Sequence, residues 1–146
     1  MKRVFVDSGG FFALLAAEDR FHDHARSLIS RANAERWRLV TTNAVVVETY
    51  SLLLVRSRGG RRAALAFLDM VADDAYRVER VRKRDEERAI ALLRAHEDKS
   101  YSLYDALSFV VMERLRIREA IAFDRHFRAY GRFTILQRPG LHADQG

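Results

Sequence analysis

The chain begins with an apolar run that ends in an acid and a glycine turn, and this feature restricts the fold most strongly. Val4, Phe5 and Val6 favour a strand, and Asp7 follows them directly, before Ser8 and two glycines. A second apolar run then begins, as in the first β–α unit of an open α/β sheet. Such sheets bind ligands beyond the carboxyl ends of their strands, so Asp7 is predicted to lie at a functional site.

The rest of the chain alternates between helical and strand patterns. Helices are predicted over residues 11–17, 23–36, 44–56, 62–72, 85–97 and 125–130, with one more opening at Ser102, and strands over 4–6, 39–42, 76–81, 120–123 and 133–136. This alternation predicts a three-layer α/β/α sandwich around a central, mostly parallel sheet. Right-handed crossovers then place all strand ends on one edge. We expect one domain over residues 1–138 and a C-terminal tail over 139–146.

Composition supports a single domain with a polyanionic partner. The 146 residues are 49% hydrophobic, enough for one continuous core. There is no cysteine, so disulfides and thiolate metal sites are excluded and a reducing cytoplasm is expected. Apolar runs fall far short of the roughly 18 residues that span a membrane. The net charge of +6 favours nucleic acid, although the excess of arginine can equally reflect a GC-rich genome.

The helical patterns also predict caps and buried faces. Ser8 and Asn43 are expected to act as N-caps, with contact to a metal-bound water as the alternative role for Ser8. Ser102 with Asp105 forms a capping-box pattern. The residues expected to face inward are Val45, Glu48, Leu52 and Val55 in the third helix, Leu65, Leu68 and Ala72 in the fourth, Ala89, Ile90 and Leu93 in the fifth, and Leu103, Leu107, Val110 and Val111 in the sixth.

Three further acids are expected at the same edge of the sheet as Asp7. Asp124 follows the strand over 120–123, Asp105 lies in the first turn of a helix, and Glu48 interrupts an apolar stripe. The capping box is the ordinary explanation for Asp105. Glu48 either lies at the edge of its stripe and reaches water, or it is neutralised by a cation. We favour the cation, since desolvating an unpaired carboxylate is costly.

Acids that converge in this way favour a divalent metal. Two carboxylates about 4 Å apart repel by about 1 kcal/mol in water and by about 4 kcal/mol at an effective dielectric of 20. Oxygen ligands without cysteine select Mg²⁺ or Mn²⁺ rather than zinc. These ions activate water and stabilise the oxygens of a phosphoryl displacement. Basic runs over 58–62 and 80–84 are interpreted as solvated surfaces, with phosphate contact as the alternative.

Four motifs, taken in their order and spacing, resemble those of PIN-domain ribonucleases, particularly VapC-type toxins of toxin–antitoxin systems. They are Val4–Ser8, Thr42–Asn43 with Glu48, Ser102–Phe109 and Ala122–Phe127. The resemblance implies that the catalytic, metal-binding residues are Asp7, Glu48, Asp105 and Asp124, and that the supporting polar residues are Ser8, Asn43 and Ser102. Tyr104 stands where many relatives carry threonine, a departure that leaves the four acids unchanged.

The resemblance also implies an activity and partners. It implies a Mg²⁺-dependent endoribonuclease that cleaves RNA with metal-activated water and leaves 5′-phosphate and 3′-hydroxyl ends. It further implies a homodimer, and a small antitoxin whose tail enters the active site. A catalytically silent RNA-binding module and a structure-specific DNA nuclease remain as alternatives.

Other site types are excluded by particular residues. A haloacid-dehalogenase-like phosphatase needs a second Asp where the chain has Gly9, and the two glycines form neither a dinucleotide fingerprint nor a P-loop. The histidines form no His-Glu-x-x-His zinc pattern. His126 is expected to be a surface or packing residue, and its position two residues after Asp124 makes it the histidine to examine.

Overall fold

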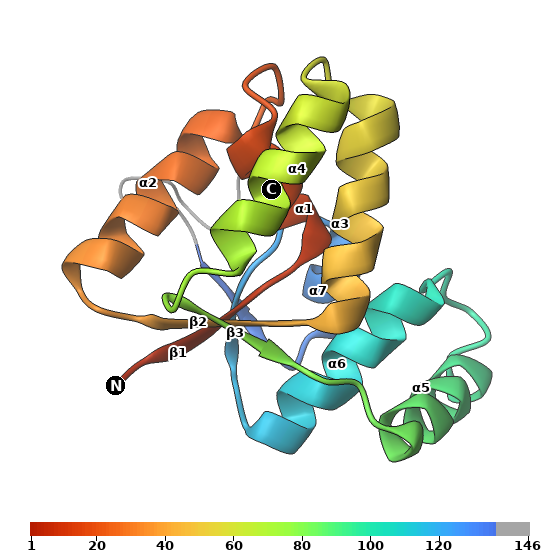
Figure 1. Ribbon diagram of the computed structural model, residues 1–146. Helices are drawn as coiled ribbons and strands as arrows, with labels where there is room; N and C mark the ends of the chain where they lie inside the picture. The colour runs from red at the N-terminus through yellow and green to blue at the C-terminus, as the bar shows by residue number, and fades with distance from the viewer. Residues whose placement is uncertain (137–146) are drawn as a thin grey trace.

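In the computed structural model, which describes residues 1–136, five short strands form one parallel sheet at the centre of the molecule (Figure 1). The strand order is β3-β2-β1-β4-β5, and every neighbouring pair is parallel. The strands are β1 (Arg3–Val6), β2 (Arg38–Thr42), β3 (Tyr76–Glu79), β4 (Glu119–Ile121) and β5 (Thr134–Ile135). Each overlaps a predicted strand. The predicted tail over 139–146 lies outside the described residues, and so do positions 137 and 138.

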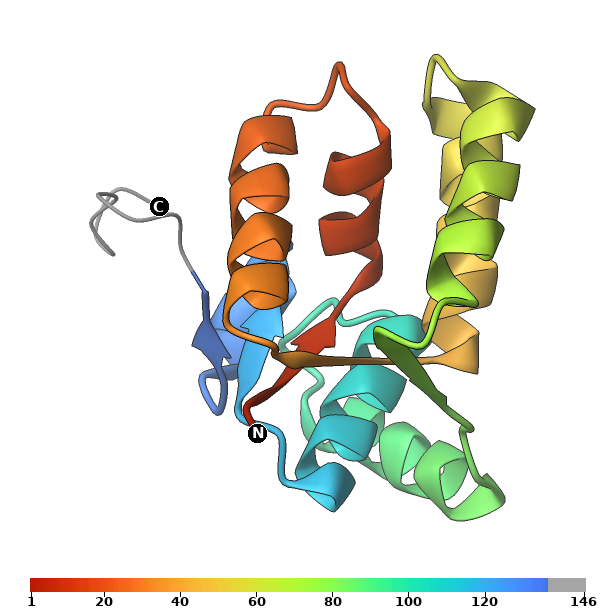
Figure 2. The ribbon, with the colours of Figure 1, turned by 60° about the vertical axis from the view of Figure 1, so that its left-hand side comes forward.

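Within residues 1–136, seven helices flank this sheet. They are α1 (Ser8–Leu15), α2 (His22–Ala34), α3 (Asn43–Arg56), α4 (Gly60–Val71), α5 (Lys83–Ala95), α6 (Leu103–Leu115) and α7 (Arg125–Tyr130). Figure 2 shows α1 to α4 on one side of the sheet and α5 and α6 on the other. The α/β/α sandwich predicted from the sequence is therefore confirmed. Within the described residues, no helix is long and apolar enough to cross a membrane.

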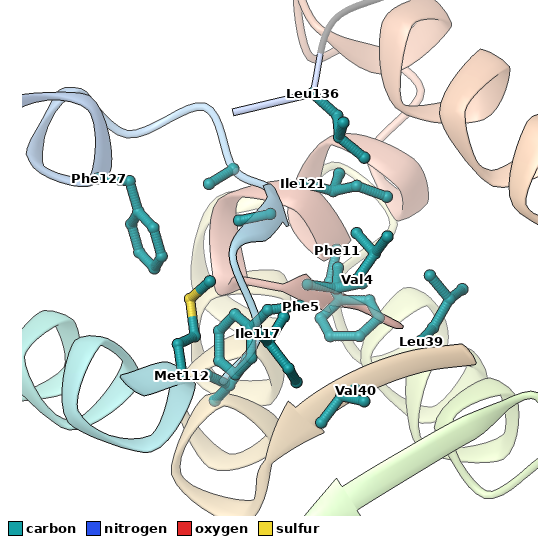
Figure 3. Close-up of a cluster of buried hydrophobic side chains, with 14 of the residues drawn as sticks. Val4, Phe5, Phe11, Leu39, Val40, Met112, Ile117, Ile121, Phe127 and Leu136 are labelled. Carbon is teal, nitrogen blue, oxygen red and sulfur yellow. The ribbon is translucent and has the colours of Figure 1, made fainter. Parts of the chain in front are cut away.

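The central strand β1 carries the core. Val4, Phe5 and Val6 are all buried, because helices cover both faces of the sheet. This is why β1 is a continuous apolar run rather than an alternating one. Figure 3 shows Phe5 beside Met112 of α6, while Phe11 of α1 lies on the opposite face of the sheet. The core thus fixes the position of the residue that follows β1.

A glycine allows α1 to pass close to β4. A Cβ atom at Gly10 would lie 2.6 Å from the carbonyl oxygen of Ile121, far inside van der Waals contact. A Cβ atom at Gly9 would meet nothing closer than 3.8 Å. The close approach of α1 to the end of β4 therefore depends on Gly10. The carboxyl ends of β1 and β4 lie side by side because Val6 pairs with Ile121.

The predicted inward face of α3 is wrong beyond its first residue. The buried residues of this helix are Val45, Thr49 and Leu53. Val55 is 78% exposed, and Leu52 is only partly buried. The helix is apolar on most sides, so periodicity alone does not select the face that packs against α1 and α4.

Similar corrections apply to the later helices. In α4 the buried residues are Ala64, Phe67 and Val71. Of the predicted residues, Leu68 is partly buried against the core, whereas Leu65 and Ala72 are exposed. Ile90 in α5 and Leu103 in α6 are 44% and 49% exposed. The predictions for Ala89 and for Leu107, Val110 and Val111 are confirmed. The errors concern rotation of a helix about its axis and leave the order of elements unchanged.

Candidate active site

The structure brings the four predicted acids together at the carboxyl edge of the sheet. Asp7 directly follows β1, and Asp124 follows β4 as the N-cap of α7. Asp105 lies in the first turn of α6, and Glu48 lies in α3. All three of the other acids raise the pKa of Asp7 through their charges, which requires that they lie near it.

Asp7 is the buried centre of this acidic cluster, and its side chain is shielded from water. Desolvation, followed by the charge of Glu48, raises the pKa of Asp7 from 3.8 to about 8. The backbone N–H of Ser8 donates to the Asp7 carboxylate and offsets only part of this rise. Without a cation, Asp7 therefore holds a proton at neutral pH.

Ser8 supports Glu48 rather than capping α1. Ser8 is the first residue of this helix, Asp7 is its N-cap, and no side chain caps it, so the predicted cap is wrong. The Ser8 side chain instead forms a hydrogen bond with the Glu48 carboxylate. Desolvation raises the pKa of Glu48, this hydrogen bond lowers it in part, and the charges of Asp105 and Asp124 raise it further.

Asp105 is held by two donors on a single oxygen. The capping box predicted with Ser102 is present: the N–H of Ser102 donates to Asp105 Oδ2 at 2.9 Å, and the N–H of Asp105 donates to Ser102 Oγ at 3.0 Å. His126 Nδ1 lies 2.8 Å from the same Oδ2. Within the described chain no hydrogen bond engages Asp105 Oδ1, so this oxygen is available to a ligand.

His126 joins the site, although the sequence indicated a surface or packing residue. Its Nδ1 lies 3.4 Å from Asp124 Oδ1, and its Nε2 lies 3.3 Å from Ser100 Oγ. A ring with the hydrogen on Nδ1 donates to Asp105 and accepts from Ser100. The N–H of His126 also donates to Asp124 Oδ1 at 2.7 Å, which caps α7. The only sequence signal for this role is the spacing of two residues after Asp124.

One face of the site could hold a cation. Asp105, Asp124 and His126 each offer one ligand atom, and these atoms lie within 4.8 Å of one another. With Asp7 and Glu48 close by, the donors are mostly carboxylate oxygens, which suit Mg²⁺ or Mn²⁺. Among the described residues, His126 is the only basic side chain within ion-pair distance of these acids, and it contacts Asp105 and Asp124 but not Asp7 or Glu48. The residues present therefore fit a divalent ion.

Asn43 does not take its predicted role as an N-cap, and Tyr104 lies on the surface. Asn43 is the first residue of α3, and Thr42 is the N-cap, with its side chain accepting from the N–H of Val45 at 3.1 Å. The predicted cap at Asn43 is therefore wrong, and Asn43 Oδ1 accepts instead from the N–H of Val81 at 2.8 Å. Tyr104 is 40% exposed at the start of α6.

Elsewhere in the fold, the charges of two buried acids, Glu79 at the end of β3 and Asp85 in α5, are neutralised by an arginine. Arg114 donates to both oxygens of Asp85 at 2.9 Å and to Glu79 at 3.1 Å. Burial alone would raise the pKa of both acids, but the hydrogen bonds and charge of Arg114 lower both below their usual values. In the part of the chain that the structure describes, no arginine forms an ion pair with the acids around Asp7, and this contrast separates a structural ion pair from a candidate metal site.

Comparison with known proteins identifies related sequences over nearly the whole chain. The PIN domain family profile matches residues 4–132. The chain is 38% identical over 128 residues to a 23S rRNA-specific endonuclease, VapC20 of Mycobacterium tuberculosis, covering 88% of this chain and 94% of the relative. It is 28% identical over 127 residues to a VapC ribonuclease of Archaeoglobus fulgidus, covering 85% of this chain and 78% of that relative.

Solved structures give the same fold. The crystal structure of M. tuberculosis VapC20, described as a sarcin–ricin loop cleaving toxin, matches with a TM-score of 0.81 and 36% identity. It covers 92% of this chain and 98% of that one. The VapBC2 structure from Rickettsia felis matches with a TM-score of 0.69 and 9% identity, over 92% of this chain and 97% of that chain, and supports the fold alone.

Proposed function

The chain belongs to the PIN-domain family, within its VapC group, and on that premise we propose that it is a divalent-metal-dependent endoribonuclease. The observation that carries the proposal is the convergence of Asp7, Glu48, Asp105 and Asp124, with no cationic side chain among residues 1–136 that neutralises Asp7. The fold pairs Asp85 with Arg114, whereas no arginine or lysine among the described residues forms an ion pair with these four acids, and this difference favours a metal-binding site.

The four acids would hold Mg²⁺, with Mn²⁺ as a substitute. When bound, the ion activates water for attack on phosphorus and neutralises charge that develops on the phosphate. The remaining contacts position the carboxylates. Ser8 orients Glu48, while Ser102 and His126 both hold Oδ2 of Asp105, so that Oδ1 would be free to bind an ion.

RNA is the substrate that the comparisons favour. Both named relatives are ribonucleases, and the more similar one acts on 23S rRNA. The net charge of +6 also suits a polyanionic substrate. We therefore take the sarcin–ricin loop, the RNA element that VapC20 is described as cleaving, as the first RNA to test.

We further propose that the chain is a toxin held in check by a small antitoxin in the cytoplasm, and that it forms a homodimer. A nuclease that cuts ribosomal RNA must be restrained in its own cell, and the related VapC20 is described as a toxin. Exposed apolar side chains on α3 and α4 offer a surface for a partner. They are Val47, Leu54, Val55 and Leu65.

Cleavage of a labelled sarcin–ricin loop RNA tests the enzymatic proposal. Purified protein should cut this hairpin with Mg²⁺ or Mn²⁺ and should stop when EDTA is added. Asp7→Asn should remove activity while circular dichroism shows an intact fold. A DNA hairpin of the same sequence serves as the control. Cleavage that persists in EDTA contradicts the metal mechanism, and faster cutting of the DNA contradicts the substrate.

Co-expression tests the partner. The protein should arrest growth when expressed alone, and the small reading frame beside its gene should relieve the arrest and co-purify with it. Size-exclusion chromatography with light scattering should report two copies of the chain. If no neighbouring frame relieves growth arrest or forms a complex, the toxin assignment fails while the nuclease assignment stands on the cleavage assay.

A further inference from the structure

A short basic segment connects β3 to α5. It consists of residues 80–84, of which Arg80, Arg82, Lys83 and Arg84 are basic and exposed. In the described part of the chain, Arg80, Lys83 and Arg84 have no carboxylate within ion-pair distance. The sequence alone is compatible with either a solvated surface or a phosphate contact. Three observations favour the phosphate contact.

The first observation is the position of the basic segment beside the acidic site. The N–H of Val81 donates to Asn43 Oδ1 at 2.8 Å, and Asn43 begins α3, the helix that carries Glu48. The segment leaves the carboxyl end of β3, two strands from the end of β1 where Asp7 lies. Two strand spacings correspond to about 10 Å. These side chains therefore lie within reach of an RNA that would be held at the acids.

The second observation is that the backbone of the basic segment is held in place from inside. Arg114 Nη2 donates to the carbonyl oxygen of Arg80 at 3.4 Å, and the N–H of Arg82 donates to Asp85 Oδ2 at 2.9 Å. Arg114 also engages Glu79 and Asp85, the acids that flank the segment in sequence. Arg82 lies 3.9 Å from Glu79, the one ion-pair contact between the segment and a described acid. The flanking acids are thus largely used internally, and the basic side chains project from a fixed backbone.

The third observation is electrostatic. Lys83 and Arg84 are the first two residues of α5, where the helix dipole disfavours positive charge. Stability alone would place acids there, as Asp85 and Glu86 show in the same turn. Two adjacent cations at this end of a helix are better explained by attraction to an external anion.

We propose that the basic segment is a phosphate-binding site that holds the RNA backbone beside the acidic cluster. Arginine presents its guanidinium in a planar fork that suits bidentate contact with phosphate. The proposal rests on the proposed ribonuclease function for its choice of ligand. The basic segment would contribute affinity for the RNA and align its backbone, while the four acids would carry out the cleavage.

The test compares two pairs of substitutions with equal charge. Arg80→Gln with Arg84→Gln alters the basic segment, and Arg58→Gln with Arg62→Gln is the control. In both pairs the residues are exposed and four apart, one in a connection and one in the first turn of the next helix. The control pair lies at the far end of α3, a helix of 14 residues and about 20 Å.

Fluorescence anisotropy with a labelled sarcin–ricin loop RNA, in EDTA, measures affinity without cleavage. At about 0.1 M salt, each phosphate contact raises the binding constant by roughly a factor of five to eight through counterion release. The two substitutions in the basic segment should therefore weaken RNA binding by about tenfold or more. The slope of log affinity against log salt should fall by about one for each phosphate that is no longer bound. The control pair should bind as the wild type does, and thermal melts of the segment pair should show no loss of stability.

Several results would overturn the proposal. Equal loss in both pairs would mean that only overall charge matters, and unchanged RNA affinity in the segment pair would remove the site. Unchanged RNA affinity with a weakened antitoxin complex would assign the segment to a protein partner. Wild-type protein that binds RNA but does not cut it would refute the proposed enzyme, while the loss in the segment pair would still support this site.

Discussion

Replacing Asp7 by Asn in metal-free protein is expected to stabilise the fold, and increasingly so as the pH rises. The Asp7 carboxyl has a pKa of about 8 in the folded protein, against 3.8 for an unperturbed aspartate. The folded state therefore binds the proton more tightly than the unfolded state does. This contribution to stability is complete below the unfolded pKa and is lost as the pH rises toward the folded pKa. Asn carries no such charge.

The size of this difference in stability follows from the raised pKa of Asp7. Each pKa unit corresponds to about 1.4 kcal/mol, and about three units separate the unfolded pKa from pH 7. Wild-type protein should therefore be less stable than Asp7→Asn by about 4 kcal/mol at neutral pH. The difference should fall below about 1 kcal/mol near pH 4. For a chain of this length, the neutral-pH value corresponds to on the order of 10 °C in Tm.

Urea denaturation in EDTA at about pH 4 and about pH 7 measures this difference. Asp69→Asn, at an exposed position on α4, is the control and should change little at either pH. Mg²⁺ should narrow the gap at neutral pH, because a ligand stabilises only the state that binds it. A wild type more stable than Asp7→Asn at neutral pH, or a gap that does not change with pH, would refute the uncompensated acidic cluster.

Three further predictions concern single positions. Gly10→Ala should lower the free energy of unfolding, measured by urea denaturation, by about 1–3 kcal/mol, because the added Cβ atom would clash with the carbonyl oxygen of Ile121. Gly9→Ala is the control and should be neutral or stabilising. Equal effects of the two substitutions would contradict the close approach of α1 to β4. Arg114→Met should cost about 3–5 kcal/mol at neutral pH by stranding two buried acids. This loss of stability should become smaller in acid. The pKa values of Glu79 and Asp85 are lowered in the folded protein, so the stability that their ion pairs contribute disappears as the two carboxylates become protonated. A loss of stability that does not depend on pH would argue against the ion pairs. Glu48→Gln should raise the metal-free Tm by less than Asp7→Asn does, and Mg²⁺ should stabilise the wild type more; a lower Tm would make Glu48 a structural partner in an ion pair.

The layers of the fold and the strand ends could be predicted because they depend on local patterns. β1 is apolar throughout since both faces of the sheet are covered, and Asp7 and Asp124 each follow a strand. Right-handed crossovers then fix the edge at which these acids lie. The capping box of Ser102 and Asp105 could be predicted for the same reason, as it involves residues only three apart.

The parts that could not be predicted depend on contacts between distant residues. Whether Val55 or Leu53 faces the core depends on the helices packed against α3, which a broadly apolar sequence does not encode. Asn43 is a residue type that commonly caps helices, but its side-chain oxygen accepts a hydrogen bond from the N–H of Val81, 38 residues away. His126 contacts Asp105 only because α6 and α7 are brought together by the sheet.

Sequencing the 5′ ends of cellular RNA after brief expression of the protein tests the central claim most directly. We expect new 5′-phosphate ends at one or a few sites in an RNA stem-loop, with 23S rRNA as the first place to examine. Cells that express Asp7→Asn at the same level should lack these ends. New ends that persist with Asp7→Asn, or no new ends with the wild type, would contradict the assignment of the acidic cluster as a ribonuclease site.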